Sequence, residues 1–209
     1  MTSLTLTPYT FNNREIARAL YQALTEDPFY ITLEQHSASD REAAREAMFR
    51  YYDYALAEAR DHGRLTLTPD ERSGAAIWNC PMDGGTEAEL SRKKKDFILD
   101  CLGSDSLRAY TEIVDFMSAQ SADVVHPEFW YLSILGLSPD CQGQGMGKDL
   151  LAPVLKETDT LGVHVYAESF TPRNFTFYER LGFQPAKLVE EPVTHSQYAI
   201  LVRPPQPLG

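Results

Sequence analysis

The stretch Tyr131-Leu-Ser-Ile-Leu-Gly-Leu-Ser-Pro-Asp-Cys-Gln-Gly-Gln-Gly-Met-Gly-Lys148 decides the fold of this chain. It begins as an apolar strand, continues as a loop with glycine at every second position, and leads directly into a helical pattern. Gly143, Gly145 and Gly147 leave the loop backbone bare, so several N–H groups can converge on one point. Because the N-terminus of the following helix adds partial positive charge, the stretch predicts an anion site suited to a phosphate or pyrophosphate.

Three glycine motifs compete for this loop. A P-loop requires Gly-Lys-Ser/Thr, whereas Lys148 is followed by Asp149 and the spacing is wrong. A dinucleotide fingerprint requires Gly-x-Gly-x-x-Gly, and here the third glycine comes one residue early. The pattern Gln/Arg-x-x-Gly-x-Gly/Ala is matched in full by Gln142, Gly145 and Gly147.

The residues that follow predict a helix, a strand and a second helix. The first helix is expected over Lys148–Thr158 and the short apolar strand over Val163–Ala167. The second helix is expected over Thr171–Phe183, with its first residue as the cap. Pro172 suits the first turn of this helix, and Gly182 suits a left-handed position at its C-terminal end.

The second helix carries a further motif, Asn-x-x-x-Phe/Tyr-Tyr-x-x-x-Gly-Phe, at Asn174, Phe177, Tyr178, Gly182 and Phe183. Together with the glycine loop, this motif resembles the GNAT acyltransferase superfamily. In detail, Trp-Tyr-Leu, Gln-Gly-x-Gly-x-Gly and Pro-Arg-Asn-x-x-Phe-Tyr-Glu-Arg-Leu-Gly-Phe resemble the branch that contains puromycin N-acetyltransferase. The resemblance is strong over about residues 126–185 and loose over the first 125 residues.

The resemblance implies an α/β fold of the GNAT type. Its central sheet is mixed and mostly antiparallel, has one splayed pair of strands, and is flanked by helices. A helical insertion is expected at about residues 82–125, before the fourth core strand, where it would help to wall the acceptor pocket. The length suits one domain over residues 1–203, followed by a loose C-terminal tail over 204–209.

Hydrophobic patterning places the other elements along the chain. The expected strands are Leu4–Thr7, Arg64–Thr68, Gly74–Asn79, Trp130–Leu137 and Gln197–Val202. The expected helices run from Asn12 or Asn13 to about Thr25, where Asp27-Pro28 ends the helix, and over Asp40–Asp61, Thr86–Leu102 and Ser104–Gln120. The run Arg92–Lys95 is interpreted as a solvated helix face, and the aromatic side of the Asp40–Asp61 helix as core.

Acetyl-CoA is the cofactor that the resemblance implies, with coenzyme A as the product. Backbone groups near Leu135–Leu137 would pair with the pantetheine amides where the two strands splay, and one N–H there would meet the thioester carbonyl. The cofactor-binding residues expected from the motifs are Leu135, Gly136, Leu137, Gln142, Gly143, Gln144, Gly145, Met146, Gly147, Lys148, Asn174, Phe177 and Tyr178.

Two residues are the catalytic candidates. The resemblance places the Tyr178 hydroxyl near the sulfur, where it would protonate the departing thiolate. Glu168, at the end of the Val163–Ala167 strand, is the candidate base, acting directly or through water; binding a cationic acceptor is its alternative role. Lesser candidates, and residues that could line the acceptor pocket, are His126, Glu128, Ser133, Trp78 and Trp130.

Composition limits the partners. A net charge of −11 argues against nucleic-acid binding and is compatible with a cationic substrate. No apolar run approaches the length of a membrane span, and no signal peptide is evident. Three cysteines in no metal spacing indicate free thiols, a cytoplasmic location and no metal site. The oligomeric state, monomer or homodimer, is left open.

The sequence therefore predicts an N-acetyltransferase that moves an acetyl group from acetyl-CoA to the amine of a small molecule by direct attack in a ternary complex. A protein acetyltransferase, acting on lysine or an N-terminus, is the first alternative. A non-catalytic acyl-CoA-binding module is the second. An acyl group longer than acetyl also fits the sequence.

Overall fold

The computed structural model describes residues 9–38 and 40–207. The strands in this part of the chain are β1 (Arg64–Leu67), β2 (Gly74–Asn79), β3 (Trp130–Leu137), β4 (Val165–Ser169), β5 (Gln184–Glu191) and β6 (Ser196–Arg203). The α-helices are α1 (Arg14–Ala23), α2 (Pro28–Gln35), α3 (Arg41–His62), α4 (Gly84–Leu102), α5 (Ser104–Ser121), α6 (Met146–Leu161) and α7 (Phe175–Arg180). The 3₁₀ turns η1 (Pro139–Cys141) and η2 (Pro172–Asn174) lead into α6 and α7.

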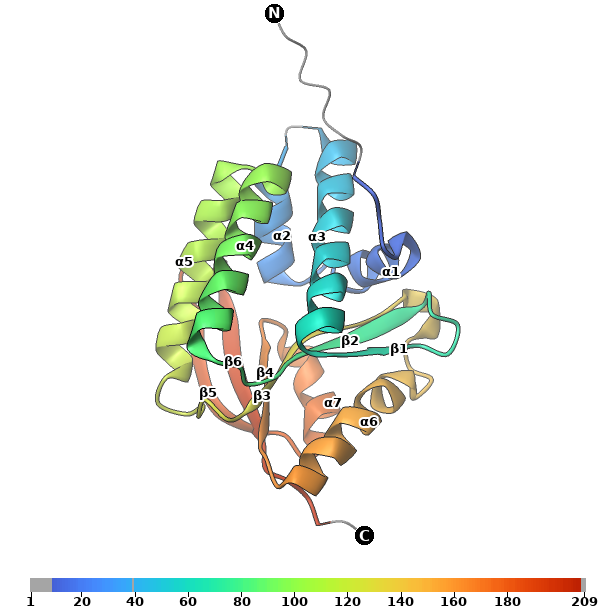
Figure 1. The fold of residues 1–209 in the computed structure, drawn as a ribbon, viewed down its shortest axis with the longest axis vertical. Coiled ribbons are helices and arrows are strands. Elements are labelled where there is room, and N and C mark those ends of the chain that lie inside the picture. The colour runs from blue at the N-terminus through green and yellow to red at the C-terminus, as the bar shows by residue number, and fades with distance from the viewer. Residues whose placement is uncertain (1–8, 39, 208–209) are drawn as a thin grey trace, which may run out of the picture.

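The strands form one mixed sheet in the order β1-β2-β3-β4-β6-β5. Only β3 and β4 run parallel, and every other neighbouring pair is antiparallel. Helices α1 to α5 lie on one side of the sheet, and α6 and α7 lie on the other (Figure 1). Two apolar cores follow from this arrangement, one on each face of the sheet.

Most predicted elements are confirmed, with corrections at three places. The strand expected over Val163–Ala167 begins and ends two residues later, so Glu168 lies inside β4. The helix expected over Thr171–Phe183 is the turn η2 followed by the short helix α7, and Thr171 makes no side-chain capping bond. Helix α2 and strand β5 were not predicted. The strand predicted over Leu4–Thr7 lies outside the described residues.

The splayed pair of strands begins at an irregularity in β3. The register with β2 pairs Ile77 with Ile134 but Trp78 with Leu132, so Ser133 is an extra residue in β3. Pairing between β3 and β4 ends at the same level, where Leu132 faces Ala167. A bulge bends its strand and shifts its side chains from one face to the other. Beyond Ser133, β3 therefore follows β2 and leaves β4, which opens the sheet between them.

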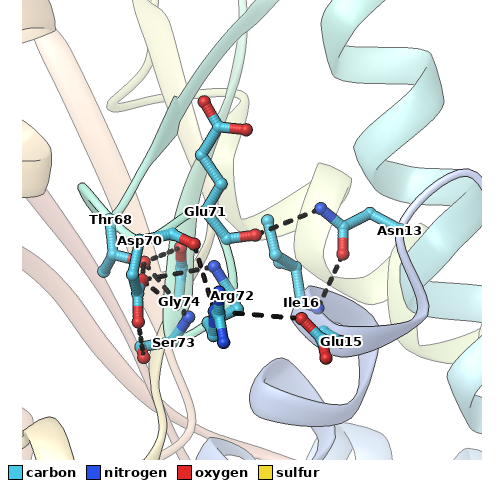
Figure 2. A network of polar contacts seen from close by, with 9 residues as sticks. All are labelled: Asn13, Glu15, Ile16, Thr68, Asp70, Glu71, Arg72, Ser73 and Gly74. Carbon is cyan, nitrogen blue, oxygen red and sulfur yellow. Dashed lines mark hydrogen bonds and ion pairs between the residues drawn. The ribbon is translucent and has the colours of Figure 1, made fainter.

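The β1–β2 turn positions the end of β3. Asp70 accepts hydrogen bonds from the hydroxyls of Thr68 (2.6 Å) and Ser73, which closes the turn on itself (Figure 2). The carbonyl of Ser73 then accepts from the backbone N–H of Ser138 at 2.8 Å. Because Ser138 follows β3 directly, this turn holds the start of the glycine-rich loop.

The same turn is also joined to α1. Figure 2 shows the Asn13 side chain between the two segments: its amide donates to the Glu71 carbonyl (3.3 Å) and its oxygen accepts from the Ile16 N–H (3.0 Å). Arg72 and Glu15 form a long ion pair of 3.9 Å at the surface. Helix α1, the turn and the glycine-rich loop are thus linked by successive hydrogen bonds.

Asp53 is expected to hold the segment before α1 in place. It is fully buried in α3 and accepts four hydrogen bonds, from the Tyr9 hydroxyl, the N–H groups of Asn12 and Asn13, and the Asn12 amide. Asp53→Asn leaves a buried donor without an acceptor, which should lower the free energy of unfolding by about 2 kcal/mol. Urea denaturation measures this loss. Asp61→Asn, at an exposed position on the same helix, is the control and should change stability little; equal effects of the two substitutions would contradict the prediction.

Candidate active site

A cavity of about 800 Å³ lies on the side of the sheet that α1 to α5 cover, and it reaches the gap between β3 and β4. Near the gap it is lined by Leu24, Asp27, Leu135, Asn174 and Tyr178. Farther along, it is lined by residues of α3, α4, α5 and the segment that leads into β3. Helix α7 lies on the opposite side of the sheet from the cavity. Its residue Tyr178 can line the cavity because β3 and β4 separate beyond the bulge in β3.

The glycine-rich loop has the geometry of an anion cradle. Gly143 and Gly145 have left-handed backbones, with φ of 74° and 84°, and both have open space where a side chain would begin. In residues 9–38 and 40–207, the backbone N–H groups of residues 143–147 donate to no other backbone group. Helix α6 begins at Met146 immediately after this loop, so its first N–H groups are free in the same place. The loop therefore presents several donors and a helix N-terminus to one ligand.

The neighbouring side chains support this loop. Gln142 donates from its side-chain amide to the Leu137 carbonyl at 3.0 Å, and Gln144 donates to the Asp140 carbonyl at 2.8 Å. These two side chains face the loop's own backbone, which leaves its N–H groups available. Lys148, in the first turn of α6, is exposed to solvent.

Two predicted cofactor residues contribute through packing. A side chain on Gly136 would lie 2.8 Å from Leu20, so glycine is required there for α1 to approach β3. A side chain on Gly147 would lie 3.3 Å from the Phe177 ring, so α7 packs directly against the start of α6. Phe177 thus fixes the loop relative to α7 by contact with Gly147.

Asn174 and Tyr178 both line the cavity although they belong to different elements. Asn174 ends the turn η2 and is exposed, whereas Tyr178 lies in α7 and is 8% exposed. The Tyr178 ring packs between Phe177 and Phe183, at centroid distances of 5.3 and 5.5 Å. Burial, followed by the charge of Asp27, raises the pKa of Tyr178, so its hydroxyl keeps its proton.

Glu168 lies on the cavity wall, on the face of β4 that α1 to α5 cover. Its carboxylate accepts hydrogen bonds from the hydroxyls of Tyr198 and Tyr131. Burial raises its pKa, and the two tyrosines oppose that rise. Glu168 thus lines the cavity, and its carboxylate already has two hydrogen-bond donors; its role as a base stays a prediction.

Asp27, which was expected only to end a helix, is a second carboxyl on the cavity wall, at the end near the gap between β3 and β4; this end is called the transfer end below. It caps α2 by accepting from the Phe29 N–H at 3.0 Å. Burial raises its pKa to about 6, against hydrogen bonds that lower it. Its charge also acts on Tyr178 and Tyr30. The Asp-Pro pair marks a helix start, and that was the signal available in the sequence.

The lesser candidates divide between the cavity and the core. Ser133 and His126 line the cavity. Glu128 is exposed and does not line it. Trp78 and Trp130 are buried in the core on the α6 side of the sheet, so neither lines the acceptor side. Tyr51, which was assigned to the core, is buried and also lines the cavity.

Comparisons with known proteins agree with this geometry. Residues 105–185 match the family model described as an acetyltransferase (GNAT) domain. A Schizosaccharomyces pombe protein named uncharacterized N-acetyltransferase C550.08 is 26% identical over 181 residues, which are 81% of this chain and 70% of that protein.

Solved structures share the fold at low identity. A structure of histone acetyltransferase HPA2 and related acetyltransferase from Corynebacterium glutamicum has a TM-score of 0.57 at 19% identity, covering 97% of this chain and 96% of that one. Arylalkylamine N-acetyltransferase 2 from Aedes aegypti has a TM-score of 0.60 at 11% identity, covering 92% and 94%. The polyamine N-acetyltransferase of Drosophila melanogaster has a TM-score of 0.56 at 14% identity, covering 92% and 96%.

Two kinds of feature are absent from the described part of the chain. It holds no helix long and apolar enough to cross a membrane, and no group of three or more His, Cys, Asp or Glu side chains placed to hold a metal ion. Residues 105–185 thus match the model of an acetyltransferase (GNAT) domain, and the motifs, the glycine loop and the splayed sheet agree with that match.

Proposed function

We propose that the chain is an N-acetyltransferase that moves an acetyl group from acetyl-CoA to the amine of a small, cationic acceptor. One observation carries the proposal: a single cavity joins the splayed strands and Tyr178 to a wall lined by carboxyls and aromatic rings. The donor and the acceptor could therefore meet inside one chain, as direct attack in a ternary complex requires.

The glycine loop fits the pyrophosphate of coenzyme A. Its free N–H groups and the N-terminus of α6 suit a doubly charged anion, and the open space at Gly143 and Gly145 admits it. Residues Ile134 to Leu137 of β3 pair with β2 on one side and with no strand on the other, so their free backbone groups suit the pantetheine amides. When bound, acetyl-CoA supplies an acetyl thioester. One β3 N–H directed at its carbonyl would stabilise the charge that develops there.

We assign a separate role in the reaction to each of three side chains, Asp27, Glu168 and Tyr178. We assign Asp27 as the proton acceptor, because its pKa of about 6 leaves it ionised but basic near neutral pH. We assign Glu168 to binding the ammonium form of the amine, since its carboxylate is already oriented by Tyr198 and Tyr131. Tyr178 keeps its proton and is assigned to protonate the departing sulfur. Asp27 would take one proton from the ammonium to give the neutral amine, which would attack the thioester carbonyl. As the C–S bond breaks, the sulfur would take the proton of Tyr178, and the second nitrogen proton would pass to the tyrosine oxygen.

The walls of the cavity favour a small acceptor over a protein. Residues of α4 and α5, which lie on the same side of the sheet as α3 (Figure 1), line one wall of the cavity. Helix α5 is anchored at both ends: Ser106 donates to the Leu33 carbonyl (2.8 Å), and Lys187 donates to the Gln120 carbonyl (2.9 Å) and binds Asp123 (2.8 Å). The names of the Aedes aegypti and Drosophila melanogaster neighbours, which refer to arylalkylamines and polyamines, support the same choice.

The domain boundaries and the closer kinship belong to the same proposal. We propose one acetyltransferase domain over residues 1–203, with the insertion at about 82–125 forming the acceptor wall. Kinship with the branch of puromycin N-acetyltransferase rests on the motifs between residues 126 and 185 alone.

Titration with acetyl-CoA by calorimetry, followed by thiol release against a panel of amines, tests the function. Micromolar binding with thiol release for small amines is the expected result. Binding without turnover on any small amine, but with acetylation of basic peptides, would replace the small acceptor by a protein. Binding with no turnover at all would indicate a CoA-binding module, and absence of binding would overturn the proposal.

Gly145→Ala should weaken acetyl-CoA binding about tenfold. The left-handed backbone at Gly145 costs a residue with a side chain roughly 1–2 kcal/mol, which shifts the loop away from its cradle conformation. Calorimetry measures the change. Gly162→Ala is the matched control, because Gly162 ends the same helix with a φ of 70° and equally open space. Equal weakening by both variants would show that the loop does not bind the cofactor.

A further inference from the structure

We propose that the acceptor carries a second positive charge and that Glu58 of α3 binds it, so that this enzyme selects linear dications over monoamines. The inference rests on the proposed function and names the substrate class of the same site. Glu58 is a specificity-determining residue here, distant from the reacting atoms.

Glu58 has one carboxylate oxygen in use and one unsatisfied. One oxygen forms an ion pair with Lys94 of α4, and both side chains are largely buried, at 15% and 20% exposure. The other oxygen is buried and has no hydrogen-bond partner among the described residues. A buried carboxylate oxygen without a donor is costly, and Glu58 and Lys94 both line the cavity. A ligand N–H group in the cavity would satisfy it.

Lys94 has the role of orienting Glu58. It belongs to the basic run Arg92–Lys95, which was expected to be a solvated face, but it turns inward across the cavity. Its ammonium donates to one oxygen of Glu58, and the other oxygen has no donor among the described residues. The pair therefore leaves a directed acceptor, as a binding site for a donor requires.

Glu58 lies at the end of the cavity away from the transfer point. Asp27 caps α2, whose Tyr30 contacts Tyr51 of α3 at a ring distance of 6.1 Å. Glu58 follows Tyr51 by seven residues, or about 10 Å along the helix axis. At the end of α3, Gly63 lies against the carbonyl of Trp78, whose partner in β3 is Leu132, the last residue before the splayed segment. An extended amine could thus reach from one carboxyl to the other.

The remaining lining suits a cationic chain. Four carboxyl groups lie on the cavity wall: Asp27, Glu58, Glu87 and Glu168. Among the described residues that line the cavity, Lys94 is the single lysine, and there is no arginine. Between the two ends the wall is aromatic, and Tyr131 and Tyr166 stack at 4.6 Å. Aromatic faces attract alkylammonium groups, and a net negative cavity favours two positive charges over one.

The test compares kcat/KM for α,ω-diaminoalkanes and for n-alkylamines of matched chain length, with the wild-type enzyme and Glu58→Gln. The wild type should prefer a diamine of suitable length about ten- to a hundredfold, the range expected for a hydrogen bond to a charged group. Glu58→Gln should remove most of this preference by slowing the diamine while leaving the monoamine unchanged. Asp61→Asn, which removes an exposed carboxylate one turn farther along α3, should keep it.

The outcomes separate the two proposals. Turnover of monoamines and diamines at equal efficiency, or an equal loss on both in Glu58→Gln, would overturn the second-charge site while the acetyltransferase stands. Failure to acetylate any amine would overturn the proposed function itself. Should Glu58→Gln unfold, as thermal melting would show, the wild-type comparison of matched diamines and monoamines decides the question alone.

Discussion

Asp27→Asn should lower kcat/KM for amine acetylation about 10²–10⁴-fold and at the same time make the free protein more stable at pH 8. The loss of activity follows because an amide cannot accept the amine proton at the transfer end of the cavity. The gain in stability follows from the position of the carboxyl. Burial raises the pKa of Asp27 from 3.8 to about 6, so the folded state holds an ionised group at a cost.

The sign of the pH dependence follows from the two pKa values. Above pH 6 the carboxyl is ionised in both states, and the full cost of about 3 kcal/mol is present. As the pH falls from 6 to 4 the folded state takes up its proton first, so the cost disappears. Asp27→Asn should therefore raise the melting temperature at pH 8 and leave it nearly unchanged below pH 4. In the wild type, kcat/KM should rise with pH through about 6, and the variant should lack this limb.

Asp40 provides a matched control, because it caps α3 as Asp27 caps α2 but is exposed to solvent. Asparagine caps a helix about as well as aspartate does, so neither substitution should weaken its cap. Asp40→Asn should change neither activity nor the pH dependence of stability. An Asp27→Asn enzyme that is fully active would remove Asp27 from catalysis. A variant that is inactive and also less stable at pH 8 would point to a structural role instead.

A partly buried carboxyl that costs the folded state free energy is expected at a functional site. The signal in the sequence was ambiguous, because Asp27-Pro28 is equally a helix break and a helix start. Helix α2 has only eight residues, too few for a helical pattern to stand out, whereas α3 has 22. The base was sought on β4, and the second carboxyl came from a helix too short to be predicted.

The glycine loop and the strand before it were predictable, because their sequence pattern is long and distinctive. β3 was placed at Trp130–Leu137, as found, since an alternating apolar strand that leads into bare glycines allows few alternatives. The bulge at Ser133 was not predictable, because alternation within one strand contains no information about register against β2. The inward position of Lys94 was not predictable either, because Lys94 belongs to a run of four basic residues. Only the packing of α4 against α3 brings it to Glu58.

Tyr178→Phe is expected to lower kcat about 10²–10⁴-fold with little change in the affinity for acetyl-CoA. The substitution removes one oxygen, and the phenyl ring keeps its packing against Phe177 and Phe183. Burial holds the pKa of Tyr178 above its usual value, so the hydroxyl is a proton donor across the working pH range. Its loss should therefore act on the departure of the thiolate and leave the cradle intact.

Thiol-release kinetics and calorimetric titration with acetyl-CoA, made on the same preparation, separate the two effects. Tyr52→Phe is the control: Tyr52 is 1% exposed, belongs to the α3 core and does not line the 800 Å³ cavity. It should leave both kcat and affinity unchanged. A fall in affinity that matches the fall in kcat would assign Tyr178 to cofactor binding, and an unchanged kcat would leave it as a packed core residue. A lower kcat at constant affinity is the signature of an acid that acts only as the C–S bond breaks, because such a group stabilises the transition state more than the bound donor.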